Sequence, residues 1–420
     1  MVSQIGWIDF SPRHRDRVRR FMDLMGMGGV VDELGVGVIR DAMSNKVFPG
    51  FSTLYTRAKY FFITPYILKE LENEKKPNIR KAEEAINNII IGFYNAHPER
   101  NAESYFGKVK RSGILKRQPS EIYWNGITLL HLINTESTLE QILHNRHSII
   151  EELLSNNRGD DITNEQGEYK NTGVDGVSYT PDWRQYIKEN GLTLSRIEAE
   201  ILRDRLLRYT PDSLPAALVS SELLWKKYLS ASNDYDSKDS LCNQMLYFIK
   251  TGLEYINNSI LRKNLIMAHD LSLFLYGIHI AYNLRLRTKT NASEDCIIKL
   301  RDLGRMWRSS LKNQMLNYED FDIRKCMVEA NVKPPTETFL IEVQKLKGSW
   351  DEIEERLCNL VENQERWNKK AKSRFLKIDK EQIIDETKDE QWVGLSLINY
   401  RYASTLSVMK DLYAGLNNID

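Results

Sequence analysis

The sequence lacks long apolar runs, closely spaced cysteines and an excess of charge of one sign. No run of about eighteen or more apolar residues occurs, and the nearest approach, residues 265–284, is interrupted by His269, Asp270 and Asn283. Residues 1–10 lack the basic and then apolar pattern of a secretory signal peptide. We therefore expect neither a membrane span nor a secretory signal, and we expect a cytoplasmic protein.

The cysteines are few and far apart. There are four, none in a CxxC pair, at Cys242, Cys296, Cys326 and Cys358. This spacing is typical of reduced thiols in a reducing compartment rather than of a disulfide framework.

The charges balance, with 59 Lys and Arg against 58 Asp and Glu and a net charge of +1. The whole chain therefore gives no reason to expect a nucleic acid or an acidic membrane as partner, and such binding needs a local patch.

Signatures of nucleotide and nuclease chemistry are absent as well. Gly107 and Gly113 are spaced six apart, and Ile114 stands where a phosphate-binding loop requires lysine. Glu342 and Lys345 miss the spacing of the E-x-K nuclease motif, and no phospholipase-D-type H-x-K motif occurs. Nucleotide hydrolysis is not expected, and no cofactor is predicted.

The composition predicts a well-packed and mainly α-helical protein. Hydrophobic residues make up 41% of the chain, which contains 20 Tyr, 13 Phe and 8 Trp. Apolar residues at helical spacing predict helices over many segments: 36–45, 53–71, 79–96, 127–132, 139–155, 193–209, 214–229, 240–259, 261–285, 294–316, 335–346, 350–374 and 391–416. We expect Pro65 to kink or break the second of these.

The order of segments suggests two domains. Residues 5–10 are apolar and predict a short strand, after which Ser11 and Pro12 open a helix to about residue 25. Residues 156–180 are rich in Gly, Asn and Asp and predict a long polar loop or linker. The expected organisation is thus an N-terminal helical unit at 1–155, which contains the strand, followed by a larger helical domain at 181–420.

Histidines provide the candidates for a metal site. His144 and His147 share a predicted helix face, Glu151 lies one turn further on, and His131 could supply a remaining ligand. Surface or capping histidines are the alternative explanation. The pair His269–Asp270 is either a functional couple or a satisfied histidine of the core.

Three basic clusters are candidates for phosphate contact. Arg13, Arg17 and Arg20 share a helix face, and a second cluster mixes cations with aromatic residues, as phosphate contact and base stacking require. That second cluster comprises Lys108, Lys110, Arg111, Lys116, Arg117, Tyr123 and Trp124. A third, Arg285, Arg287 and Lys289, ends a helix where the dipole favours cations. The alternative for all three is a solvated face balanced by nearby acids.

Arg57 and Lys59 stand at the start of a predicted helix that is otherwise aromatic and apolar. Cations buried in such a segment need partners. We predict a polar network with Asp32, Glu33 or Asp41, and keep an anion-binding site as the alternative. In the predicted helix 193–209, Glu198 and Glu200 are interpreted as part of an ordinary charged face. The apolar face of the same helix is predicted to consist of Leu194, Ile197, Ile201 and Leu202.

The first 155 residues or so resemble a family of uncharacterised bacterial proteins. The resemblance is carried by Ile5-Gly-Trp-Ile-Asp-Phe-Ser11, by the segment 31–42 and by Thr56-Arg-Ala-Lys-Tyr-Phe-Phe62. Weaker likeness extends to residues 198–207 and to the end of the chain around Tyr400-Arg401.

That family resembles components of anti-phage defence clusters of the Azaca type, whose neighbours are a helicase-like and a phospholipase-D-like protein. The resemblance implies that the motor and the nuclease are other chains. We therefore expect a non-enzymatic scaffold or nucleic-acid-sensing subunit. The alternatives are a metal-dependent, nuclease-like hydrolase and a pure protein-interaction subunit.

Overall fold

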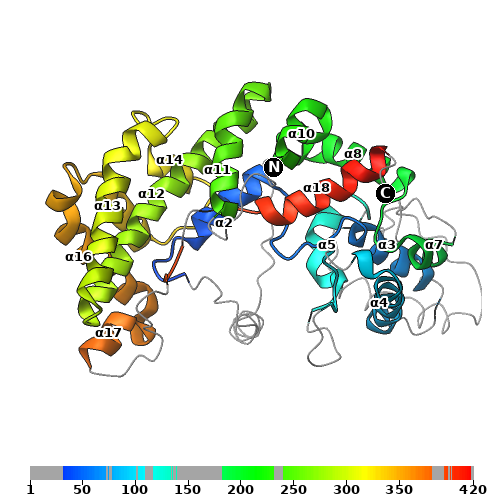
Figure 1. Cartoon of the computed structure of the whole chain (residues 1–420), viewed down its shortest axis with the longest axis horizontal. Coiled ribbons are helices and arrows are strands. Elements are labelled where there is room, and N and C mark those ends of the chain that lie inside the picture. The colour runs from blue at the N-terminus through cyan, green and yellow to red at the C-terminus, as the bar shows by residue number, and fades with distance from the viewer. Residues whose placement is uncertain are drawn as a thin grey trace, which may run out of the picture. The chain divides into compact units, whose positions relative to one another are not determined.

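The structure is a computed structural model in which the described residues form α-helices, 3-10 helices, turns and loops. It describes residues 32–71, 74, 78–100, 103–108, 117–133, 135, 139, 182–230, 240–380, 392–395, 398 and 400–417. No strand occurs in these segments, so the mainly α prediction is confirmed (Figure 1). The predicted strand at 5–10 and the helix after it lie outside the described residues.

The chain divides into two compact units, each built from separated stretches of sequence. Unit 1 comprises residues 1–41 and 269–398, and unit 2 comprises residues 42–268 and 399–420. The expected linker, 156–180, lies outside the described residues, and segments from both sides of it pack within unit 2.

Unit 2 contains most of the shorter helices. In chain order these are α3 (Tyr60–Glu70), α4 (Ile79–Ala96), α5 (Pro119–Leu129), α7 (Trp183–Asn190), α8 (Arg196–Tyr209), α9 (Leu214–Ser220), α10 (Glu222–Ser230), α11 (Ser240–Gly252) and α18 (Tyr402–Asn417). Helix α3 packs against α4 and α5, α4 against α7, and α18 against α8.

The close packing of α18 on α8 depends on a glycine. A Cβ atom at Gly415 would lie 2.9 Å from Cβ of Ala199, closer than real Cβ atoms approach, and would make a tight contact of 3.1 Å with Cβ of Leu194. Helix α18 thus becomes part of the core of unit 2, next to residues from the middle of the sequence.

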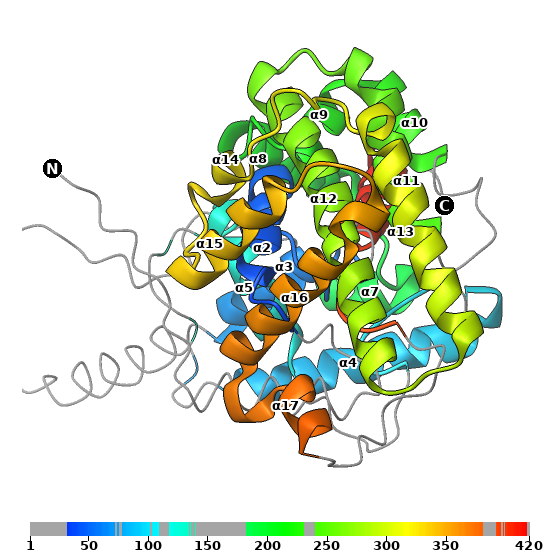
Figure 2. The ribbon, with the colours of Figure 1, turned by 90° about the vertical axis from the view of Figure 1, so that its left-hand side faces the viewer.

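The described part of unit 1 contains helices of 5 to 21 residues. Its members are α13 (Glu294–Gln314), α14 (Ile323–Met327), α15 (Pro334–Gln344), α16 (Trp350–Lys369) and α17 (Arg374–Asp379). Figure 2 shows α15 leading into α16, which also packs on α13 and α17. Trp307 of α13 and Trp350 of α16 meet edge to face, with ring centroids 6.1 Å apart.

Two helices contribute to both units, namely α2 (Gly37–Val47) and α12 (Ser259–Lys289). By length and composition α12 could cross a membrane, but 83% of its apolar window is buried inside the protein. Buried core helices pass the same test of length and composition, so this helix is weak evidence for a membrane span.

Several helices agree closely with the sequence prediction, and α4 matches it at both ends. Here the Oδ1 atom of Asn78 accepts a hydrogen bond from the Lys81 N–H at 3.0 Å, an N-cap that fixes where the helix begins.

The prediction of one helix over residues 53–71 is wrong at its start, because α3 begins only at Tyr60. The side chains of Tyr123 and Asp411 accept hydrogen bonds from the backbone N–H groups of Thr56 and Ala58. These bonds keep residues 56–58 out of the helix. The expected break at Pro65 is not found, since α3 runs through it.

Two further predictions need correction for local reasons. The predicted helix 214–229 is two helices, because Ser221 ends α9 and its Oγ accepts from the Leu224 N–H at the start of α10. No helix is predicted over residues 104–126, yet they include most of α5, which begins with Pro119 in its first turn.

A buried carboxylate joins α4 to the start of α5. Glu83 is 3% exposed and accepts hydrogen bonds from the Ser120 N–H at 2.8 Å and the Ser120 hydroxyl at 3.0 Å. Burial raises the pKa of Glu83 to about 7, although the two hydrogen bonds from Ser120 act in the opposite direction.

This raised pKa makes stability depend on pH. The contribution of Glu83 is fully present below the ordinary pKa of 4.5 and is lost as pH rises through about 7. Glu83→Gln removes the titration, so the wild type should lose roughly 3 kcal/mol relative to this variant between pH 4.5 and 8. Urea unfolding at several pH values measures the difference. Glu84→Gln, next along α4 and exposed, is the control, and equal pH profiles for wild type and Glu83→Gln would contradict the prediction.

Candidate functional site

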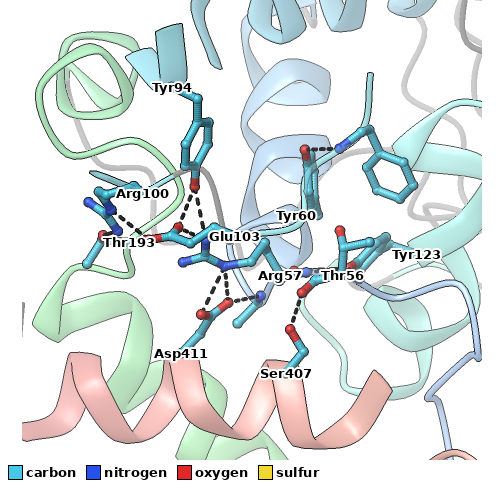
Figure 3. A network of polar contacts seen from close by, with 12 residues as sticks. Thr56, Arg57, Tyr60, Tyr94, Arg100, Glu103, Tyr123, Thr193, Ser407 and Asp411 are labelled. Atoms are coloured by element: carbon cyan, nitrogen blue, oxygen red, sulfur yellow. Dashed lines mark hydrogen bonds and ion pairs between the residues drawn. The ribbon is translucent and has the colours of Figure 1, made fainter. Parts of the chain in front are cut away.

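Arg57 lies at the centre of a buried polar network in unit 2 (Figure 3). Its Nε donates to both carboxylate oxygens of Asp411 on α18, at 3.0 and 2.9 Å. Its Nη1 donates to the Tyr94 hydroxyl at 2.9 Å and to the carboxylate of Glu103. One guanidinium thus joins the end of α4, the loop after it and the last helix.

Glu103 completes the network. It also accepts hydrogen bonds from Arg100 at 2.6 Å and from the Tyr94 hydroxyl at 2.7 Å. Burial would raise the pKa of Glu103, but Arg100 and Arg57 together hold it below its ordinary value. Two guanidinium groups therefore face two carboxylates, so the described residues of the network carry no surplus positive charge for an outside anion.

The backbone before α3 is fixed by the same residues. The N–H of Ala58 donates to Asp411 at 2.7 Å, and the N–H groups of Thr56 and Arg57 donate to the Tyr123 hydroxyl. The Ser407 hydroxyl of α18 donates to the Thr56 carbonyl (Figure 3). This segment is thereby tied to α5 and α18 at once.

Lys59 forms a second and even more buried ion pair. Its Nζ lies 2.8 and 2.6 Å from the two carboxylate oxygens of Glu198, and both side chains are at most 2% exposed. The Tyr66 hydroxyl donates to the same carboxylate at 3.0 Å, and the Tyr186 ring centroid lies 4.3 Å from Nζ. Burial lowers the pKa of Lys59, while the charge of Glu198 opposes this effect.

Glu198 also caps its own helix. It accepts from the Ser195 N–H at 2.8 Å, while the Ser195 hydroxyl accepts from the Glu198 N–H, which is a capping box. The buried side of α8 therefore includes Glu198, whereas Ile197, expected on the apolar face, is 60% exposed. The interpretation of Glu198 as part of an ordinary charged face is wrong.

The partners of Arg57 and Lys59 differ from those expected. Asp32 instead accepts from the N–H groups of Val36 and Gly37 at the start of α2. Glu33 pairs with Lys369 and Arg374, and Asp41 pairs with Arg40. The geometry around Arg57 and Lys59 is that of an internal polar network rather than an open anion site.

The candidate nucleic-acid residues are only partly described. Lys108 is exposed, and its Nζ donates to the Glu103 carbonyl at 2.9 Å, while Arg117 and Trp124 are half-buried. Six of the predicted cations lie outside the described residues, namely Arg13, Arg17, Arg20, Lys110, Arg111 and Lys116.

Tyr123 does not have the predicted role. It is fully buried, its ring stacks on Tyr55 with centroids 4.0 Å apart, and its hydroxyl donates to the Arg57 carbonyl. A ring in this position cannot stack on a nucleic-acid base. Tyr123 is part of the core that supports the Arg57 network.

The metal candidates His144, His147 and Glu151 also lie outside the described residues. Within the described ranges no group of three or more His, Cys, Asp or Glu side chains could hold a metal ion. His131 is described and exposed, and its ring stacks on Tyr209.

The other polar residues singled out from the sequence have structural partners. The Nδ1 atom of His269 lies 2.8 Å from the Oδ1 atom of Asp270. The carboxylate of Asp270 also accepts hydrogen bonds from the N–H groups of Leu316 and Asn317. Among the predicted third basic cluster, Arg285 and Lys289 both pair with Glu362.

A basic surface that the sequence prediction missed lies where α16 turns into α17. We name it the lysine corner, and it consists of Lys370, Lys372, Lys377 and Lys380. All four side chains are exposed, and none forms an ion pair with a described residue. The sequence contains a sign of this surface, because no acidic residue occurs between Glu365 and Asp379.

The buried pair Lys59–Glu198 gives a test of the interior network. Lys59→Met leaves a buried carboxylate without its cation and should cost about 3–5 kcal/mol of unfolding free energy. Adding Glu198→Gln should recover part of this loss, since the two changes are coupled. Urea unfolding measures both variants.

The control for that experiment is the exposed pair Lys226–Glu222 on α10. Lys226→Met makes the same substitution in an ion pair that is exposed to water, and it should leave the urea midpoint unchanged. Strictly additive effects of Lys59→Met and Glu198→Gln would show that the two side chains do not interact.

Comparison with known proteins adds little to this geometry. Residues 2–146 match a family described as "Family of unknown function (DUF6361)". Neither a curated protein nor a solved structure matches the chain.

Proposed function

We propose that the protein is a non-catalytic, nucleic-acid-binding subunit of a bacterial anti-phage defence complex in the cytoplasm. The observation that supports this proposal is the lysine corner of unit 1, whose four exposed ammonium groups have no carboxylate partner among the described residues. Closely spaced cations of this kind attract the phosphate backbone of nucleic acids.

The nearby carboxylates are already used by other cations. Glu33 binds Lys369 and Arg374, and Asp379 binds Arg366 and Lys289. Within the described segments these carboxylates are therefore not available to neutralise the lysine corner. Binding a polyanion would release its counterions, which is the main source of affinity in such complexes.

An exposed aromatic residue adjoins this surface. Trp367, near the end of α16, is 37% exposed, and the Nζ atom of Lys333 lies 5.8 Å from its ring centroid. Cations beside an accessible indole ring combine phosphate contact with base stacking, the combination used by proteins that bind single strands.

The resemblance to defence proteins supplies the proposed context. In such a complex a helicase-like chain and a phospholipase-D-like chain carry out the reactions, and this subunit contacts the nucleic acid. The interior cations Arg57 and Lys59 take no part in this contact, because their charges are matched inside unit 2.

A second candidate function is that of a pure protein-interaction subunit. It is favoured by a groove of about 980 Å³ in unit 1, with Trp307 and Trp350 in its wall and the half-exposed Met306 at its edge. Copurification with a partner protein, without any binding of nucleic acid, would favour this function over the first.

The salt dependence of binding tests the proposed function. The triple variant Lys372→Gln, Lys377→Gln and Lys380→Gln removes three cations of the lysine corner. The slope of log affinity against log salt concentration should become shallower by about 2 to 3. Fluorescence anisotropy with a labelled oligonucleotide over a salt series gives this slope.

A matched control changes three exposed lysines that already have carboxylate partners. These are Lys226, Lys299 and Lys312, paired with Glu222, Asp295 and Glu319. Replacing all three with Gln alters the net charge equally and should leave the slope unchanged. Equal effects of the two triple variants would contradict a specific role for the lysine corner.

A further inference from the structure

We infer that unit 2 carries a binding site for an unpaired nucleotide, formed where the end of α5 meets the end of α8. The site consists of His131, Arg205, Arg208 and Tyr209, and we name it the α5–α8 platform. The inference rests on the proposed function and adds to it the form of nucleic acid that is bound, namely single strands.

The platform is a stack of two rings with cations beside it. The His131 ring lies 4.2 Å from the Tyr209 ring, with 23° between their planes. The guanidinium carbons of Arg205 and Arg208 lie 5.6 and 5.5 Å from the Tyr209 centroid. His131 and Arg208 are exposed, so the stack is open to a ligand.

The two arginines differ from the other arginines of α8. Arg196 pairs with Glu200, and Arg203 pairs with Asp204. Arg205 and Arg208 form no ion pair within the described part of the chain, and Arg205 donates to the Tyr209 hydroxyl at 3.1 Å. Two guanidinium groups are thus held at the ring, and no carboxylate among the described residues pairs with either of them.

The backbone of His131 shows that its position is unusual. The N–H of His131 donates to Thr128 and the N–H of Leu132 donates to Ile127, the Schellman pattern that ends many helices. The residue at this position adopts a left-handed conformation, here with φ of +50°, and is usually glycine. Histidine is less favourable there, but it places an imidazole on Tyr209.

These features suit a nucleotide whose base is free to stack. A base can extend the stack on the exposed side of His131, while Arg205 and Arg208 contact the adjoining phosphates. In a duplex the bases are already paired and stacked on one another, so no base face is free to stack on the imidazole. The platform should therefore favour single strands over duplexes.

The test replaces His131 by the residue that its backbone prefers. His131→Gly relieves the left-handed conformation and removes the outer ring of the stack. We expect the variant to fold and to lose about fivefold or more of its affinity for a single-stranded oligonucleotide. Affinity for a duplex of the same sequence should be unchanged, as measured by fluorescence anisotropy.

The chain offers a matched control for this backbone change. Asn291 follows α12 at the same position of a helix end, where the N–H of Ala292 donates to the Arg287 carbonyl, and has φ of +53°. Asn291→Gly relieves the same conformation in unit 1, at a residue that is not part of the platform, and should leave both affinities unchanged. A second variant, Arg205→Gln with Arg208→Gln, keeps the stack, and its affinity for the single strand should also fall.

The possible outcomes separate this inference from the proposed function. If His131→Gly and the double arginine variant bind single strands as the wild type does, while the lysine-corner variant binds less, the platform is refuted and the proposed function stands. If the wild type binds neither single strands nor duplexes at low salt, both are refuted. A selective loss for single strands supports the platform.

Discussion

The organisation of unit 2 depends on an ion pair that is almost completely removed from water. Lys59 and Glu198 are 139 positions apart, and neither charge is tolerable in the interior without the other. Arg57 and Asp411, 354 positions apart, impose the same condition on the end of the chain. Three segments that are far apart in the sequence must therefore meet before all of these charges are satisfied, which favours cooperative folding of the unit.

Local features of the fold could be predicted from the sequence, and distant pairings could not. The ends of α4 follow from its N-cap Asn78 and its amphipathic pattern, and Arg57 and Lys59 could be identified as cations in an apolar segment. Their partners could not be identified, because helical periodicity contains no information about which distant segment lies alongside. For the same reason Glu198, buried against Lys59, was assigned to the surface and Ile197, which is 60% exposed, to the core.

The candidate sites show a similar division between sequence and structure. The absence of acids between Glu365 and Asp379 marks the lysine corner in the sequence, although only the structure shows which of its cations are paired. Tyr123 stands near basic residues in the sequence, yet its ring points into the core. The α5–α8 platform could not be predicted from the sequence. It depends on a left-handed backbone at His131 and on the contact of this residue with the ring of Tyr209, which lies far along the sequence.

The central claim is that buried cations hold the fold together and exposed cations bind nucleic acid. Hydrogen–deuterium exchange of the full chain, with and without a single-stranded oligonucleotide, tests it most directly. The account predicts added protection at residues 205–210 and 370–380, with no change at residues 56–60 or around Asp411. Added protection confined to residues 56–60 and to the surroundings of Asp411 would contradict it.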